Sequence, residues 1–398
     1  MSKIFDLIEA EQARQDMTVE LIASENFVSE DVMKAVGSCL TNKYCEGYPE
    51  LRSLGNEGRY YGGCQVVDQI EEYCRELWKK VFKTDYHVNV QPHSGSQANQ
   101  AAYAAILKPG DTILSLQLND GGHLTHGSNV NFSGKLYNFV FYNVTPEGFI
   151  DYNDIKEKIA QYKPNLVLAG YSAYPRTIDF KRIKTLIEEQ TTEDYKPYFM
   201  VDVAHIAGLI AAEEHPTPFG LADIITTTTH KTLRGPRGGM IFCRPELAKK
   251  VDSAVFPGHQ GGPLMHVIAG KAVAAEECLK PEYKEYIQQV VKNCKAMAEE
   301  FTKRGMYVVT GGTENHLLLL DLSKTHPTIT GKRAQETLDK FGISLNKNCV
   351  HGETRSPKEA SGLRIGTAAM TTKGYREEDF VKVADKIVDV LNAMTWLD

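Results

Sequence analysis

The chain has 398 residues, with 45 lysines and arginines against 51 aspartates and glutamates, a formal net charge of −6. This length exceeds what one core usually serves, so we expect a large domain with a smaller one. The 42% hydrophobic and 24% charged residues are typical of a globular protein, and the acidic balance argues against a nucleic-acid partner. No apolar run predicts a membrane span or a signal peptide. Eight scattered cysteines without a C-x-x-C pair favour a reducing, cytoplasmic location.

Hydrophobic periodicity predicts three helices in the N-terminal region, at residues 4–20, 29–40 and 66–82. In the second of these, Ser29 is placed to cap a helix that begins at Glu30.

The central region alternates short apolar runs with amphipathic stretches. We expect strands at 87–91, 112–116, 136–142, 166–170, 198–203, 224–228 and 240–243, and helices at 96–107, 152–161, 180–189 and 247–255. This alternation predicts the α/β class, with a mostly parallel seven-stranded sheet covered by helices.

From about residue 281 the pattern changes to a long charged helix at 283–304, strands at 307–309 and 316–321, and helices at 331–341 and 377–394. We therefore predict a large domain, residues 1–280, that includes an N-terminal helical arm, and a small α+β domain, residues 281–398.

Lys231 follows the threonine run 226–229 and precedes the glycine-rich segment 235–239. This setting is typical of a lysine at the end of a buried strand, where its pKa falls and its amine can form a Schiff base with an aldehyde cofactor. The alternative is a solvated surface lysine, which is the commoner situation for lysines in general.

Two other strand ends carry polar groups suited to a ligand. Asp202 ends the strand at 198–203, at the edge of a parallel sheet where ligands bind, although it could equally cap the next helix. The segment 93–99 opens a helix whose amides suit a phosphate, or it is an ordinary serine-capped helix. Neither a Walker A loop nor a strand-linked G-x-G-x-x-G occurs, which argues against nucleotide binding.

The glycine-rich loop 121–127 contains His123, whose ring could stack on a planar cofactor or be solvated. Metal binding is a third and weaker alternative for this loop, because no carboxylate or cysteine stands at ligand spacing near it. The segment 256–263 is rich in glycine and proline, which suits an anion, a subunit contact or a plain loop.

Glu46 lies among tyrosines, where a raised pKa would let it exchange protons near neutrality, although a surface glutamate is the more ordinary interpretation. Arg364 lies between apolar residues, which suits bidentate binding of a substrate carboxylate or a structural ion pair.

A lysine for an imine, an acid for a pyridine nitrogen, an anion-binding helix start, a stacking ring and an arginine together indicate a pyridoxal-phosphate enzyme. A non-catalytic binding protein on this fold would be expected to have lost the lysine or the phosphate loop.

The chain also closely resembles the serine hydroxymethyltransferase family, from about residue 21 to residue 374. The motifs that carry the resemblance are LIASEN (21–26), NKY-x-EGYP (42–49), YYGG (60–63), QPHSGSQAN (91–99), GGHLTHG (121–127), VD-x-x-H-x-AG (201–208), TTTTHK (226–231), FPG (256–258), GGPLMH (261–266) and NKN (346–348).

The resemblance implies a fold type I pyridoxal-phosphate transferase and a homodimer or tetramer with active sites shared between subunits. Lys231 would hold the internal aldimine. The implied cofactor-binding residues are Ser94, Gly95, Ser96, His123, Ser172, Asp202 and His205, with Tyr44, Gly261 and Gly262 reaching the neighbouring subunit's phosphate. Glu46, Tyr61 and His230 would be catalytic with Lys231, and Ser24, Glu46, Tyr60, Tyr61 and Arg364 would bind substrate. The implied folate-binding residues are Leu118, Gly122, His123, Leu124, Asn348 and Ser356.

The implied reaction is reversible transfer of the serine hydroxymethyl group to tetrahydrofolate, giving glycine and 5,10-methylenetetrahydrofolate. Two departures from the family pattern bear on folate. The spacer 50–59 between Pro49 and Tyr60 is longer than usual, and Lys358 and Glu359 stand where the family commonly places apolar residues. They motivate an alternative, a folate-independent threonine aldolase or transaldolase on the same scaffold.

Overall fold

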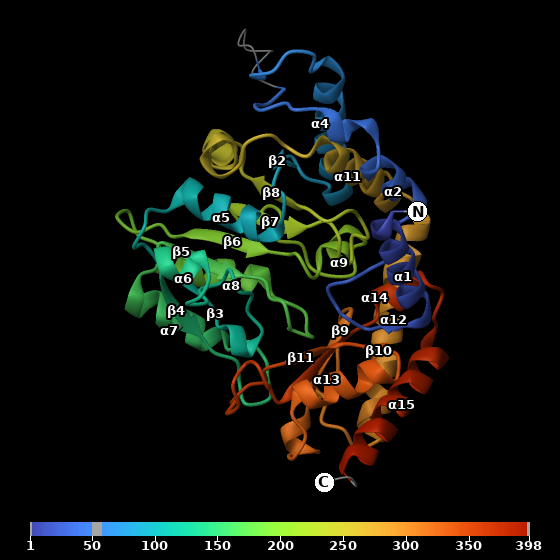
Figure 1. Cartoon of the computed structure of the whole chain (residues 1–398). Coiled ribbons are helices and arrows are strands. Elements are labelled where there is room, and N and C mark those ends of the chain that lie inside the picture. Colours follow the sequence, from blue (N-terminus) through green and yellow to red (C-terminus); the bar gives the residue numbers. More distant parts are fainter. Residues whose placement is uncertain (1, 50–57, 396–398) are drawn as a thin grey trace.

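The computed structural model describes residues 2–49 and 58–395. At its centre is a seven-stranded sheet in the order β2-β8-β7-β6-β5-β3-β4 (Figure 1). Its strands are β2 (His87–Asn89), β3 (Thr112–Leu116), β4 (Asn138–Tyr142), β5 (Leu166–Ala169), β6 (Tyr198–Asp202), β7 (Ile224–Thr228) and β8 (Gly239–Cys243). Strands β4, β3, β5, β6 and β7 run parallel, and β8 is antiparallel to both of its neighbours. The seven strands expected from sequence and the mostly parallel sheet are confirmed.

Alternate residues of each strand enter different cores, because successive side chains of a strand point to opposite faces. In β6, Phe199 and Val201 belong to one core and Met200 to the other. The first core is covered by α4 (Gln65–Phe82), α7 (Tyr152–Tyr162), α8 (Phe180–Gln190), α9 (Ala207–Ala211) and α11 (Met265–Cys278). The second is covered by α5 (Gly95–Ile106) and α10 (Ala248–Ser253). Burial on both faces explains why the strands read as continuous apolar runs.

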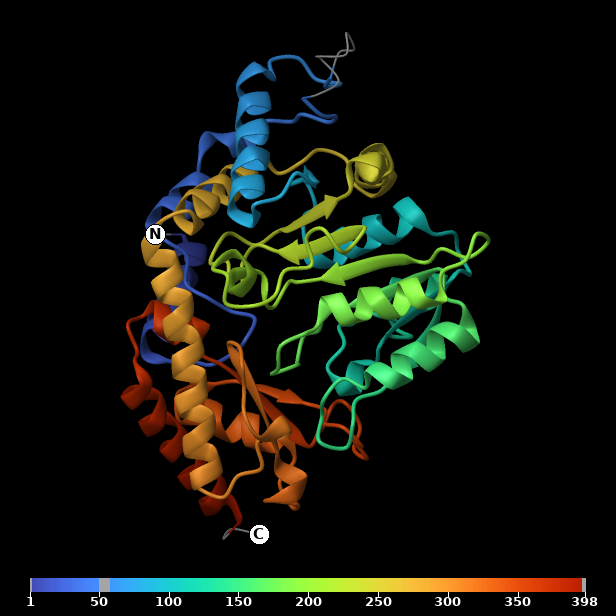
Figure 2. The same ribbon diagram turned by 180° about the vertical axis from the view of Figure 1, so that it is seen from behind.

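A third core holds the C-terminal part together. It lies around the antiparallel sheet β11-β12-β9, made of β9 (Leu317–Asp321), β11 (Asn346–Asn348) and β12 (Gly362–Gly366), with α13 (Gly331–Lys340) and α15 (Glu377–Thr395). The long helix α12 (Pro281–Lys303) runs from one part to the other (Figure 2). Its residues up to Val290 pack in the first core and those from Cys294 pack in the third. The division after residue 280 stays a prediction.

The N-terminal segment differs from the expected helix at 4–20. Helix α1 (Lys3–Met17) ends earlier, and β1 (Val19–Glu20) pairs in parallel with β10 (Ile343–Ser344). The backbone hydrogen bonds that residues 19 and 20 form with β10 therefore outweigh the local sequence pattern, which favours a longer helix. Helix α1 buries none of its side chains in its own subunit, and the large apolar residues of its first half, Ile4, Phe5, Leu7 and Ile8, are 55–58% exposed.

Other boundaries also differ from expectation. The helix capped by Ser29 is confirmed, but α2 (Glu30–Val36) stops at Gly37 and a short 3₁₀ turn (Cys39–Asn42) follows. The helix expected at 247–255 is α10 flanked by a 3₁₀ turn and a π turn. The strand expected at 307–309 is wrong: Val308 makes only one isolated bridge, because Thr310 and Gly311 adopt positive φ and turn the chain.

A buried arginine, Arg59, fixes the N-terminal segment against α4. Its guanidinium donates to Asp68 Oδ1 at 2.9 Å and Glu71 Oε2 at 2.7 Å. It also donates to the carbonyl oxygens of Cys45 and Gly47, at 3.0 and 2.7 Å. Gly47 and Arg59 form an antiparallel bridge, so the chain just before the long spacer lies beside the spacer's last residue. Most of the spacer, residues 50–57, lies outside the described residues.

We expect Arg59→Met to lower the free energy of unfolding by about 3–5 kcal/mol, because Glu71 would remain as a buried carboxylate without its counter-charge. Denaturant titration measures the change. The control is Lys156→Met, which removes an exposed ion pair with Glu189 and should cost less than about 1 kcal/mol. Equal costs for the two variants would contradict this account of Arg59.

Candidate active site

A cleft of about 660 Å³ opens at the carboxyl ends of β5, β6 and β7, between the large sheet and the small one. Ligand sites of α/β proteins occur at such strand ends. Most residues singled out from the sequence line this cleft: Ser24, Ser94, Gly95, Ser96, Leu118, Gly122, His123, Leu124, Ser172, Asp202, His205, His230, Lys231, Asn348 and Arg364. Tyr44, Glu46, Tyr60, Tyr61, Gly261, Gly262 and Ser356 are not part of its lining.

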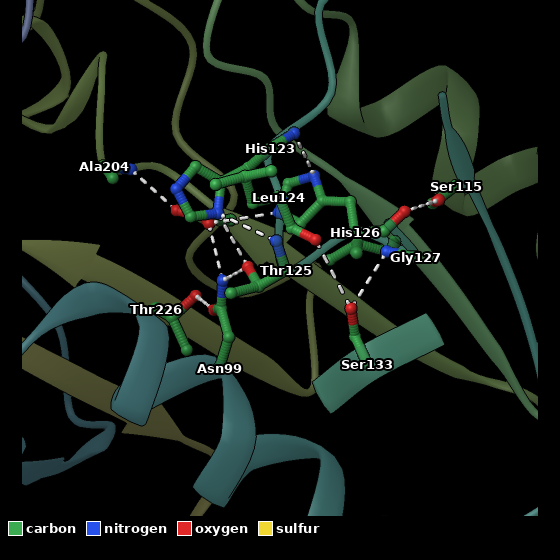
Figure 3. A network of polar contacts seen from close by, with 12 residues as sticks. Asn99, Ser115, His123, Leu124, Thr125, His126, Gly127, Ser133, Ala204 and Thr226 are labelled. Atoms are coloured by element: carbon green, nitrogen blue, oxygen red, sulfur yellow. Dashed lines mark hydrogen bonds and ion pairs between the residues drawn. The ribbon is translucent and has the colours of Figure 1, made fainter. Parts of the chain in front are cut away.

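Asp202 ends β6, and three donors hold its carboxylate. Figure 3 labels the three residues that supply these donors, Asn99, His126 and Ala204. Asn99 Nδ2 and His126 Nε2 lie 2.9 and 3.2 Å from Oδ2, and the Ala204 amide donates to Oδ1 at 3.0 Å. Burial would raise the pKa of Asp202, but these hydrogen bonds and the nearby histidines lower it overall. The helix-cap alternative is wrong, since α9 begins after Ile206 and receives no side-chain cap.

Lys231 lies in the turn after β7 and is only 7% exposed. Burial lowers the pKa of its amine to about 8, although the charge of Asp202 opposes the shift. The turn is fixed by its backbone: Asn26 Nδ2 donates to the carbonyl of Lys231 at 2.9 Å, and the Thr229 amide donates to that of Gly238 at 3.1 Å. The surface-lysine alternative is therefore wrong.

The start of α5 forms the anion-binding end of the cleft. Ser94 caps the helix, its Oγ accepting from the Gln97 amide at 3.3 Å. A Cβ at Gly95 would lie 2.6 Å from Thr228 Cγ2, so only glycine lets the helix start approach β7. Thr228 Oγ1 also lines this end, buried and without a hydrogen-bond partner among the described residues. An unpaired buried hydroxyl beside a helix N-terminus fits a phosphate oxygen. Thr228 belongs to the threonine run before Lys231, but nothing in the sequence distinguishes it from the other threonines of that run.

Arg364 reaches the cleft from β12 of the small sheet. It donates to the Ser172 carbonyl at 3.0 Å and to Asn346 Oδ1 at 2.7 Å, both neutral oxygens rather than ion-pair partners. Its Nε is buried and has no hydrogen-bond partner among the described residues, and burial lowers the pKa of Arg364 to about 10. A buried guanidinium with one unused N–H donor is suited to binding a carboxylate ligand.

The histidines of the cleft are neutral. Burial lowers the pKa of His123 to about 4 and that of His230 to about 3, and it holds His205 well below the ordinary value. His205 Nδ1 lies 3.3 Å from Nε2 of His316, a buried partner that the sequence gave no reason to select. His123 Nδ1 lies 2.8 Å from Thr125 Oγ1, which fixes the ring at the cleft wall.

His123, His126 and Asp202 bring their ligand atoms within 4.8 Å of one another, a grouping that could hold a metal ion and that sequence spacing did not indicate. His126 already shares a hydrogen bond with the carboxylate of Asp202, however, so support of that carboxylate also explains why these side chains lie together.

A second group of residues lies together but apart from the cleft of its own chain. Tyr44 OH donates to Glu46 Oε1 at 3.3 Å, and the rings of Tyr44 and Tyr61 are 4.7 Å apart. A Cβ at Gly261 would lie 3.0 Å from Glu46 Oε1, and one at Gly262 2.9 Å from the ring of Tyr44. The long spacer therefore does not prevent Glu46 and Tyr61 from converging. Tyr44, Tyr60 and Tyr61 are 51%, 79% and 41% exposed, which leaves this group open to a partner.

The residues expected to contact folate surround the mouth of the cleft. Leu118 and Leu124 are 37% and 47% exposed, and Asn348 belongs to β11. Pro357, rather than the expected Ser356, lines the cleft. Glu359 turns toward α13, where it accepts from Thr330 Oγ1 at 3.2 Å and pairs with Lys332 at 3.4 Å. Neither Lys358 nor Glu359 is part of the cleft lining, so this departure from the family pattern does not place a charge there.

The comparison with protein families gives a match that covers almost the whole sequence. The model of the serine hydroxymethyltransferase family matches residues 1–387. Nothing in the match or in the geometry of the site favours the folate-independent alternative. The buried lysine, the ionised aspartate and the unpaired donors of Thr228 and Arg364 fit the cofactor and amino-acid substrate of that family. The chain belongs to the serine hydroxymethyltransferase family, pyridoxal-phosphate enzymes that interconvert serine and glycine with tetrahydrofolate as cosubstrate.

Proposed function

We propose that Lys231 is the residue that holds pyridoxal phosphate covalently in this glycine hydroxymethyltransferase, with Asp202 at the pyridine nitrogen. The observation that carries this assignment is a buried amine and a buried carboxylate facing one cleft, the amine with a pKa of about 8. Near neutral pH a useful fraction of such an amine is uncharged and nucleophilic, unlike an exposed lysine. When bound, the cofactor supplies an electron sink for bond cleavage at the substrate α-carbon.

The other residues of the cleft bind the cofactor and orient it. Ser94, Gly95 and Ser96, with Thr228 Oγ1, are placed to bind the phosphate at the start of α5. His123 provides a flat, neutral ring for stacking, and His205 a neutral contact for the 3-oxygen. Ser172 completes the cofactor pocket, and His230, which also lines the cleft, is a proposed catalytic residue beside Lys231.

Arg364 and Ser24 are placed to bind the substrate carboxylate. Binding at the unpaired Nε of Arg364 would fix the rotation of the substrate about its α-carbon, which selects the bond that breaks.

Glu46, Tyr60 and Tyr61 serve the cleft of a neighbouring subunit in this proposal, because they lie outside the cleft of their own chain and are accessible. The family is oligomeric, and the exposed apolar side of α1 agrees with subunit contacts. Tyr44, Gly261 and Gly262 would reach the neighbour's cofactor phosphate, and Glu46 would move the proton at the serine hydroxyl.

Leu118, Gly122, His123, Leu124 and Asn348 form the proposed folate site at the mouth of the cleft, with Ser356 on the adjacent turn. The exposed leucines suit the flat face of a pterin.

We also propose a cytoplasmic location. The eight cysteines are free thiols, as expected in a reducing compartment. Among the described residues, no helix is both long enough and apolar enough to cross a lipid bilayer.

Lys231→Ala should abolish the visible-edge absorbance of the lysine-bound cofactor and reduce turnover by roughly 10³-fold or more, because the nucleophilic amine is lost. The thermal midpoint of the apoprotein should stay close to that of the wild type, which shows that the fold is retained. Persistence of the covalent absorbance in this variant would refute the assignment of Lys231.

The shared site is tested by mixing two inactive variants, Lys231→Ala and Glu46→Gln. Glu46→Gln should lower turnover about 10²- to 10⁴-fold as a proton-transfer defect. If Glu46 serves the neighbour, each mixed dimer contains one site with both residues intact, and random reassociation should restore roughly a quarter of wild-type activity. If both residues act within one subunit, mixing restores nothing.

A further inference from the structure

A second buried lysine, Lys271, takes no part in the chemistry described above. It lies on α11 and is 1% exposed. Its Nζ donates to three backbone carbonyls, those of Val90 at 2.6 Å, Pro92 at 3.1 Å and Gly239 at 2.8 Å. Three acceptors require three N–H donors, which only the protonated amine has. Its charge is therefore held by backbone oxygens, and no carboxylate of residues 2–49 or 58–395 pairs directly with it.

These three carbonyls belong to the two segments that shape the phosphate-binding end of the cleft. Val90 and Pro92 lead from β2 to Ser94, and Gly239 begins β8. The two segments also meet directly: the Gly239 amide donates to the Pro92 carbonyl at 3.0 Å, and a Cβ at Gly239 would lie 2.4 Å from the carbonyl oxygen of Ser94.

The same ammonium lies behind the turn that carries Lys231. A Cβ at Gly238 would meet Lys271 Cε at 2.5 Å and Nζ at 3.0 Å. Gly238 in turn accepts from the Thr229 amide at 3.1 Å and donates to His230 Nδ1 at 3.4 Å.

The segment that leads into α11 holds the same backbone through a second side chain, that of Gln260. Gln260 Nε2 donates to the Gln91 carbonyl at 2.9 Å, and Gln260 Oε1 accepts from the His93 amide at 3.0 Å. Residues 90–93 are thus held at consecutive positions by Gln260 and Lys271.

We infer that Lys271 is a positioning residue for the cofactor phosphate: its ammonium fixes the backbone of residues 90–95 and 238–239 and places a positive charge behind the phosphate-binding helix start. This inference rests on the proposed phosphate site at Ser94, Gly95 and Ser96. A charge in a low-dielectric interior acts on a phosphate more strongly than one in water does.

The test compares two ligands that differ only in the phosphate, pyridoxal phosphate and pyridoxal, titrated into the apo form of the full-length protein. Lys271→Met keeps the length of the side chain and removes all three donors together with the charge. It should weaken pyridoxal phosphate binding roughly 10- to 100-fold, as loss of charge-assisted hydrogen bonds does, and change pyridoxal binding by less than about threefold. With the cofactor saturating, the KM for serine should stay within about twofold of the wild-type value.

The matched control is Asn293→Leu, which removes a buried side chain with three hydrogen bonds, to Gln289, Thr371 and Tyr375, none of which lines the cleft. It should lower the thermal midpoint without changing the ratio of the two affinities. Gln260→Met is the second variant and should weaken the phosphate-dependent binding in the same direction, whether or not Lys271→Met folds.

If the folded Lys271 and Gln260 variants keep the wild-type ratio of pyridoxal phosphate affinity to pyridoxal affinity, the inference is overturned. Lys271 would then only stabilise the fold. If the wild type itself binds pyridoxal as tightly as pyridoxal phosphate, the proposed phosphate site fails instead, so the two failures are distinguishable.

Discussion

The structure of the site depends on keeping one carboxylate, that of Asp202, ionised while it is buried. Desolvation alone would protonate it, and a neutral acid could not stabilise a positive charge beside it. Donors from three segments prevent this: Asn99 on α5, His126 in the loop after β3, and the amide of Ala204. Thr226 extends the network, since its Oγ1 donates to Asn99 Oδ1 at 2.6 Å. The sheet order places β6 and β7 side by side, so Asp202 and Lys231 leave adjacent strands toward the same cleft.

The small sheet completes the cleft from the other side. Arg364 on β12 reaches across to the carbonyl of Ser172, and Asn26 joins the N-terminal segment to the Lys231 turn. One consequence is that the two parts of the chain are linked through polar contacts at the site itself. A substrate carboxylate bound at Arg364 would therefore also influence how closely the small sheet approaches the large one.

Much of the large domain could be predicted from local sequence, because its strands are buried on both faces and their apolar runs are unambiguous. Lys231, Asp202 and Ser94 could be found for a related reason: each is a polar residue at the end of such a run. Helix α11 is not predicted from the sequence because it is buried on most sides, rich in alanine, and lacks a clear polar face. The short strands β1, β10 and β11 depend on hydrogen bonds to distant segments and leave little local pattern.

The partners of the site residues were the least predictable part. His316, Thr228 and Lys271 gain their roles only from the three-dimensional arrangement, since nothing in their immediate sequence distinguishes them from ordinary buried residues. The division of the site into a cleft and a separate tyrosine-rich group was predicted only through the family resemblance. In the structure Tyr44, Glu46 and Gly261 lie against one another, and none of them lines the cleft.

The central claim is that Asp202 keeps its charge in the folded protein and uses it to hold a proton on the cofactor's pyridine nitrogen. The most direct measurement is the nitrogen-15 chemical shift of pyridoxal phosphate labelled at that nitrogen and bound to the wild-type protein and to Asp202→Asn. The account predicts a protonated nitrogen in the wild type throughout the neutral pH range and an unprotonated one in the variant. An unprotonated nitrogen in the wild type, or the same shift in both proteins, would contradict it.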